Sequence, residues 1–183
     1  MIQPPQPLSK EQLFTLDPAG APVTNKLPGE LRNFCFLLQP NFSMMALTSA
    51  IDALRTANLL SEEELYTFRL VSLDGAAVCS DLGFSAMADQ ALEELNFDHL
   101  DAFVVCGGLR VELQTPPKII RFLRQPELRK KTLGSLWNGL FALAHAGVIN
   151  DKKAVVHRSN RASFRETFAD INLKDKAYVI DHQ

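Results

Sequence analysis

The sequence has little of what would identify a membrane, secreted or nucleic-acid-binding protein. Its 183 residues carry 19 basic and 21 acidic side chains, and the resulting net charge of −2 leaves no electrostatic footprint for nucleic acid. No apolar run is long enough to cross a bilayer. The first ten residues contain three prolines but no apolar segment typical of a secretory signal. These absences favour a cytoplasmic protein with no direct contact to a membrane.

The cysteines are few and form no pattern. Cys35, Cys79 and Cys106 are an odd number with no Cys-x-x-Cys pair and no Cys/His cluster, and each lies in or beside a strand-like run. Reduced, buried thiols are therefore favoured over a disulfide or a metal site. We expect neither a metal nor a cofactor.

The sequence does contain enough apolar residues, 46%, for one domain with a substantial core. Residues 1–30 hold six prolines and two glycines and are predicted to form a proline-rich N-terminal arm, with a helical turn at Ser9–Phe14. The remaining residues, 31–183, are predicted to form the domain itself.

From residue 31 onward, strand-like and helix-like patterns alternate. We predict strands at 33–38, 66–73, 102–106, 132–136, 154–156 and 177–180, a hairpin at 77–80 and 84–87, and helices at 44–59, 116–123, 138–146 and 160–168. This order implies an α/β fold with a mostly parallel sheet and helices on both faces. Sites in such folds form beyond the carboxyl ends of the strands, which directs attention to the loops 40–44, 107–110, 136–139 and 157–160.

One of these loops has the setting of a nucleophile elbow, in which a strand runs directly into a helix with a small residue, here Gly139, close by. The residue at the elbow is Trp137. An indole is no nucleophile and its only polar group is one N–H donor, and Asn138 does not replace the lost chemistry. The sequence therefore predicts a site without catalytic activity.

Two other loops offer less specific signals. Gly107 and Gly108 follow a strand at once and could leave backbone N–H groups open to a carboxylate, although a plain turn fits equally well. His157 could orient or protonate a ligand, but a hydrogen-bonded structural histidine is favoured in the absence of context. The basic segment 121–131 is typical of a solvated helix end.

Several of these segments together resemble a known family. Phe36–Leu47, Val104–Gly108, Leu133–Gly139 and Tyr178–Asp181 are similar to the corresponding parts of a group of AraC-type bacterial transcription regulators. Their N-terminal domain is DJ-1/PfpI-like, related to class I glutamine amidotransferases. The resemblance covers residues 32–181 and implies a flavodoxin-like three-layer sandwich, usually dimeric, that senses a metabolite such as arginine, carnitine or betaine. A C-terminal pair of helix-turn-helix motifs binds DNA in these regulators; because the sequence stops at Gln183, we expect only the sensor part here.

The sequence departs from this family at the catalytic positions. Many members carry a cysteine at the elbow, where this chain has Trp137, and the carboxylate of catalytic members is not evident in Asn41-Phe42-Ser43. Both departures argue against hydrolysis and against thiolate chemistry.

The resulting hypothesis is a ligand-sensing and dimerisation domain that binds an amino acid or a quaternary amine in a degenerate cleft. The expected lining is Asn41, Phe42, Ser43, Gly107, Gly108, Leu109, Trp137, Asn138, His157 and Arg158. In this hypothesis the two glycine amides hold a carboxylate and Trp137 stacks on a cationic group. The expected partners are a small-molecule effector, a second copy and, only through a module not in this chain, DNA. Two alternatives stay open: a DJ-1/PfpI-type hydrolase using Cys106, and a ligand-free scaffold whose cleft Trp137 fills.

Overall fold

The computed structural model describes residues 30–61 and 63–181, so the predicted turn at Ser9–Phe14 and nearly all of the predicted arm lie outside the described residues. The central sheet consists of β1 (Arg32–Leu38), β2 (Tyr66–Ser72), β5 (Gln90–Ala91), β6 (Ala102–Cys106) and β7 (Thr132–Leu136). Its strand order is β5-β2-β1-β6-β7, and every neighbouring pair is parallel. The predicted parallel sheet is therefore confirmed.

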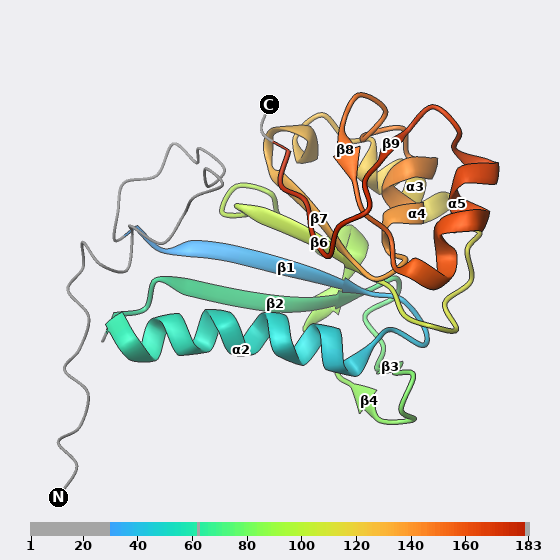
Figure 1. The fold of residues 1–183 in the computed structure, drawn as a ribbon. Helices are drawn as coiled ribbons and strands as arrows, with labels where there is room; N and C mark the ends of the chain where they lie inside the picture. Colours follow the sequence, from blue (N-terminus) through green and yellow to red (C-terminus); the bar gives the residue numbers. More distant parts are fainter. Residues whose placement is uncertain (1–29, 62, 182–183) are drawn as a thin grey trace, which may run out of the picture.

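Helices cover both faces of this sheet (Figure 1). One face is covered by α2 (Met44–Ser61), and the other by α3 (Pro117–Leu123), α4 (Leu140–His145) and α5 (Arg161–Thr167). Along β1, Phe36 and Leu38 pack in the core on the α2 side, whereas Cys35 and Leu37 pack in the core on the other side. This alternation gives the predicted three-layer sandwich.

The start of α2 follows from its sequence. The hydroxyl of Ser43 accepts a hydrogen bond from the N–H of Ala46 at 3.4 Å, which is an N-cap contact. Before it, β1 ends in a continuous buried run, which is typical of a central parallel strand whose two faces are both covered.

The end of the described chain differs from the prediction. Residues 177–180 form no strand, and the short β9 (Asn172–Leu173) pairs instead with β8 (Lys153–Ala154) as a separate parallel ribbon. The apolar run at 177–180 suggested a strand, but a strand also needs a hydrogen-bonded neighbour, which residue propensity cannot supply. The predicted hairpin is confirmed as β3 (Val78–Cys79) paired antiparallel with β4 (Ser85–Ala86).

The topology determines where a site can form. From β1 the chain continues to β2 on one side and later returns to β6 on the other, so the sheet has its switch point between β1 and β6. When the short β5 is set aside, the strand order is β2-β1-β6-β7. Numbered along the chain, these four strands have the order 2-1-3-4, which is that of flavodoxin-like sheets. Among the described helices, none is both long and apolar enough to cross a membrane.

Candidate functional site

The loops that follow β1, β6 and β7 meet at the carboxyl edge of the sheet. The N–H of Ser43 donates to the carbonyl of Gly107 at 2.9 Å, and the N–H of Gly108 donates to Oδ1 of Asn138 at 2.8 Å. Asn138 is 2% exposed, so its side chain is an internal tie between the second and third loops. The predicted convergence of these loops is confirmed.

Glycine is required where the loops cross. A Cβ on Gly108 would lie 2.3 Å from the carbonyl oxygen of Asn41, and one on Gly107 would lie 2.1 Å from Oδ1 of Asn138. The Gly107 N–H donates to the carbonyl of Leu136 at 3.1 Å, and the Gly108 N–H is taken by Asn138. The prediction that these two amides hold a ligand carboxylate is therefore wrong, because both already have acceptors within the chain.

The β3–β4 hairpin is hydrogen-bonded to the loop after β1. The N–H of Asn41 donates to the carbonyl of Cys79 at 2.8 Å, and the N–H of Asp81 donates to the carbonyl of Phe42 at 2.9 Å. Phe42 itself is fully buried in the core on the α2 side. The hairpin and this loop thus form one hydrogen-bonded unit.

The turn from β7 into α4 has the geometry of an elbow. Trp137 has a φ of 58°, in the left-handed region that residues other than glycine rarely adopt. A Cβ on Gly139 would lie 2.2 Å from the carbonyl oxygen of Val105, so the turn also needs its small residue. The strand–turn–helix arrangement predicted at 134–139 is confirmed.

The side chain of Trp137 stacks on His157. The two ring centroids are 3.6 Å apart and the planes differ by 12°. Nδ1 of His157 lies 2.8 Å from the hydroxyl of Ser159. Partial burial, and to a lesser extent the guanidinium of Arg158, lower the pKa of His157 below its ordinary value. The imidazole on the indole is therefore protonated less readily than an ordinary histidine.

Trp137 and His157 line a groove of about 1140 Å³ along the outer edge of β7. The groove is strongly cationic although the whole chain has a net charge of −2. Its charged lining residues are Arg129, Lys130, Lys131, Lys152, Lys153, Arg158 and Lys176, with Asp181 as the one acidic residue among them. Such a surface attracts anionic groups.

The ten predicted site residues fall into two sets. Five of them are buried and therefore part of the framework: Phe42, Ser43, Gly107, Gly108 and Asn138. Asn41, Trp137 and His157 are partly buried, and Leu109 and Arg158 are exposed. Of these, Trp137, His157 and Arg158 line the groove. The groove-lining lysines at 152, 153 and 176 were not among the residues predicted from the sequence, since no sequence pattern relates them to the turn at 137.

The two buried thiols offer no alternative nucleophile. Cys106 is 1% exposed, and burial raises its pKa far above the ordinary value; burial also raises the pKa of Cys35 to about 12. Neither forms a thiolate near neutral pH. Cys79 is exposed, so the prediction that all three thiols are buried is wrong at this position, which lies on a two-residue strand of the peripheral hairpin.

The fold and site define an α/β sandwich of the kind that carries nucleophile elbows, here with a tryptophan at the elbow. Residues 32–183 match the DJ-1/PfpI family, and the chain belongs to that family. The predicted family and fold are thereby confirmed.

Several relatives of this chain are transcription regulators. The HTH-type transcriptional regulator GbdR of Pseudomonas aeruginosa is 32% identical over 162 residues, 88% of this chain and 43% of the relative. CdhR, an HTH-type transcriptional regulator of the same organism, is 33% identical over 150 residues, 82% of this chain and 44% of the relative. The crystal structure of an AraC family transcriptional regulator from Pseudomonas putida is 37% identical with a TM-score of 0.72, over 82% of this chain and 80% of that one. The chain spans less than half the length of the curated relatives it matches.

Proposed function

We propose that this chain is the effector-sensing domain of a cytoplasmic transcription regulator that works as a homodimer, and that it has no catalytic activity. The observation that carries the proposal is the pairing of an elbow occupied by Trp137 with an open groove beside it, in a chain whose relatives are regulators. DNA binding would fall to a separate module, as the names of the HTH-type relatives suggest.

The absence of a nucleophile supports the non-catalytic part of the proposal. An indole cannot attack a carbonyl, and the Cys106 thiol is buried with a raised pKa. The amides of Gly107 and Gly108 are occupied, so they do not offer an oxyanion site either. These observations speak against the DJ-1/PfpI-type hydrolase.

The groove suggests the class of effector. An aromatic wall at Trp137 and a cationic lining that includes Arg158 suit a molecule with a carboxylate and an apolar or cationic group, such as an amino acid or a carboxylated quaternary amine. The carboxylate would pair with Arg158, and the other end would lie against the Trp137 indole where it lines the groove. Asn41 and Leu109 would border the site from the neighbouring loops. A cation without a carboxylate would be repelled by the lining.

The open groove also favours sensing over a ligand-free scaffold. A scaffold in which Trp137 fills the cleft would leave no sizeable cavity beside the indole, whereas the groove exceeds the usual size of small-molecule sites.

Trp137 provides the test, because it is the only tryptophan in the chain and its fluorescence reports on this site alone. Betaine, carnitine and arginine are titrated, with choline as the matched compound that keeps the trimethylammonium group but lacks the carboxylate. We expect a saturable change with at least one carboxylate ligand, none with choline, and about tenfold weaker binding or more in Arg158→Gln. Arg165→Gln, on α5 and outside the groove, serves as the control variant.

No fluorescence change and no heat of binding with any of these ligands at millimolar concentration would remove this class of effector. Binding of choline as tightly as betaine would contradict the role given to Arg158.

A further inference from the structure

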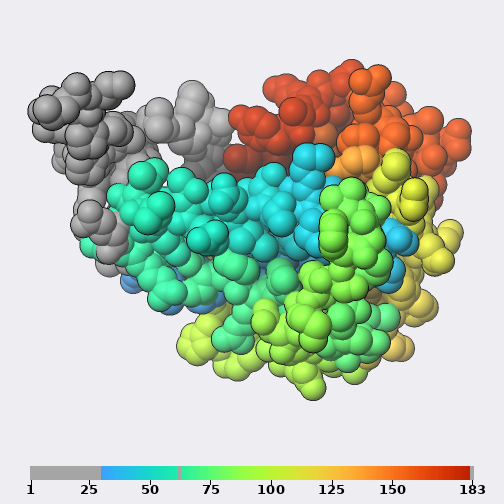
Figure 2. All heavy atoms as spheres, turned by 90° about the horizontal axis from the view of Figure 1, so that it is seen from below, coloured from blue at the N-terminus to red at the C-terminus, as the bar shows by residue number. Residues whose placement is uncertain are grey.

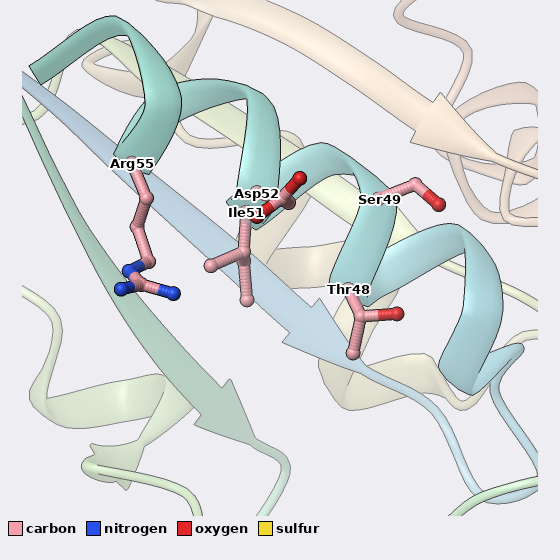
Figure 3. Close-up of a pocket in the computed structure, with 5 residues that line it drawn as sticks. All are labelled: Thr48, Ser49, Ile51, Asp52 and Arg55. Atoms are coloured by element: carbon pink, nitrogen blue, oxygen red, sulfur yellow. The ribbon is translucent and has the colours of Figure 1, made fainter. Parts of the chain in front are cut away.

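The hollow on the outer face of α2 does not bring chemical groups together. It is shallow and is lined by residues of that one helix: Thr48, Ser49, Ile51, Asp52 and Arg55. Its two charged side chains point to different sides of the helix, so they do not converge on a ligand (Figure 3). The groove along β7 is lined instead by residues from several segments, and it is the better place for a further binding site.

This groove has two ends. All five residues of β7 line it, and a strand of that length spans about 13 Å. Trp137 follows β7, His157 follows β8, and the N–H of His157 donates to the carbonyl of Trp137 at 3.4 Å, so these two rings mark one end. The starts of β7 and β8 border the other end, which we call the lysine end. Its cationic residues are Arg129, Lys130, Lys131, Lys152 and Lys153.

The lysine end has an excess of positive charge. Within residues 30–61 and 63–181, none of its five cationic side chains forms an ion pair. Glu127 and Asp151 are close to them in the sequence but do not line the groove. Like charges gathered along one hollow raise the local potential and attract anions. The lysine end therefore favours a ligand with negative charge.

One anion already lies at this end, and it belongs to the chain itself. Oδ2 of Asp181 accepts a hydrogen bond from the backbone N–H of Lys153 at 2.5 Å. Asp181 is the one acidic residue among those that line the groove. Backbone amides and lysine side chains are also the groups with which proteins bind phosphate oxygens. The structure thus shows an oxyanion in place at the lysine end.

Asp181 lies on a segment with little regular structure. Residues 174–181 form no helix or strand, and Arg161 holds the beginning of this segment through an ion pair with Asp175. From there the segment runs back past β7 along the groove (Figure 1). Figure 2 shows the C-terminal part of the chain, in red, on the outside of the molecule. Tyr178 is 69% exposed, so the contact of Asp181 fixes the far end of a segment that is otherwise open to solvent.

We propose that the lysine end is a binding site for a phosphate group, and that phosphate binds there by displacing the carboxylate of Asp181. A carboxylate carries one negative charge, whereas a phosphate carries about 1.5 to 2 at pH 7 and therefore neutralises more of the five cations. Its oxygens accept from the N–H of Lys153 and from the lysine side chains around it. Free phosphate and a phosphate monoester present the same group to the site.

The inference goes beyond the proposed function and does not depend on it. The effector is placed at the end of the groove marked by Trp137, and the phosphate at the opposite end. Displacement of Asp181 would free the far end of residues 174–181, which line the groove between the two sites.

Amide resonances of the 15N-labelled 183-residue chain test the site directly, because the N–H of Lys153 is the group that Asp181 releases. Inorganic phosphate and glycerol 3-phosphate are titrated at constant ionic strength, with chloride and glycerol as the matched controls. We expect saturable shifts of the amides of Lys153 and of residues 176–181 with phosphate, and none with chloride or glycerol.

Two variants should change the affinity in opposite directions. Asp181→Asn removes the competing charge and should tighten phosphate binding by about threefold or more. Lys130→Gln combined with Lys153→Gln removes two of the five cations and should weaken it by about tenfold. Arg165→Gln, on α5 and outside the groove, is the matched control and should leave it unchanged. The spectrum of each variant shows that it is folded, and a general disturbance of the site could not produce both signs.

Three outcomes would overturn the proposal: no saturable shift with either phosphate at millimolar concentration, an equal response to chloride, or weaker phosphate binding in Asp181→Asn. A response to glycerol 3-phosphate alone would support a site for phosphate esters, and a response to both would support recognition of the phosphate group itself. Shifts with duplex DNA but with neither phosphate would assign the lysine end to a nucleic-acid backbone and overturn the small-anion site.

The effector titration followed by Trp137 fluorescence reports on the other end of the groove. A phosphate response without any effector response would sink the sensing proposal alone, whereas an effector response without any phosphate response would sink the phosphate site alone.

Discussion

The backbone at Trp137 leads to a prediction about stability that reverses the usual rule that glycine is less stabilising than alanine. Its φ of 58° lies in the left-handed region, where a Cβ costs about 1–2 kcal/mol. Trp137→Ala and Trp137→Gly both remove the indole and its stack on His157. They differ only in whether the Cβ remains, so comparing them isolates the strain.

The magnitude follows from two opposing effects. Both variants lose the stacking contact, worth about 0.5–1.5 kcal/mol. Glycine also loses about 0.4–1 kcal/mol relative to alanine, because it gives the unfolded chain more freedom. Because glycine has no Cβ, it is free of the backbone strain of about 1–2 kcal/mol that alanine keeps in the left-handed region. At the middle of these ranges, a gain of about 1.5 less a cost of about 0.7, Trp137→Gly should be more stable than Trp137→Ala by about 0.8 kcal/mol, or a few degrees in Tm.

Urea unfolding followed by far-UV circular dichroism measures this difference. Thr56→Ala and Thr56→Gly, at an exposed interior position of α2, form the control pair, and there glycine should be the less stable by about 1 kcal/mol. If Trp137→Ala proves as stable as Trp137→Gly, or more stable, the elbow is not strained and the reasoning fails.

Three further predictions concern the surroundings of the elbow. Asn138→Ala leaves the N–H of Gly108 buried without an acceptor and should destabilise the domain by about 1–3 kcal/mol in the same urea assay; a negligible loss would contradict the internal tie. In the folded chain Cys79 should react with iodoacetamide far faster than Cys106, as followed by mass spectrometry, and similar rates would revive the hydrolase. The pKa of His157 in the folded chain is lowered from its ordinary value of 6.5, so on acidification the unfolded chain takes up a proton at His157 before the folded chain does. The contribution of His157 to the free energy of unfolding is therefore present above pH 6.5 and is lost as the pH falls. Quenching of Trp137 fluorescence by the protonated ring should accordingly have a midpoint below 6.5 and vanish in His157→Gln, and a midpoint above 6.5 would refute the assignment.

The strands that carry the site could be predicted from the sequence. The structure has β6 at 102–106 and β7 at 132–136, as predicted. The first is a buried apolar run that two glycines end at once, which is typical of a central parallel strand. The run at 177–180 has similar residues, but within residues 30–61 and 63–181 no neighbouring strand completes its hydrogen bonds. Local sequence reveals the tendency to form a strand, and the partner depends on the rest of the fold.

The site was predictable in its position and not in its chemistry. Parallel topology alone brings the loops to one edge, so their convergence followed from the order of the elements. The acceptor for the amide of Gly108 is a side chain 30 residues further along, which no local pattern relates to the glycine. The cationic lining is likewise gathered from separate segments around residues 130, 153 and 176.

The hydrogen bonds between the β3–β4 hairpin and the loop after β1 have a mechanical consequence. Asn41 and Phe42 are each bonded through the backbone to the hairpin, at 2.8 Å to Cys79 and 2.9 Å to Asp81. This loop cannot shift without carrying the hairpin along, and the hairpin bears the exposed Phe84. A movement of Asn41 would therefore be passed to the hairpin surface that carries Phe84.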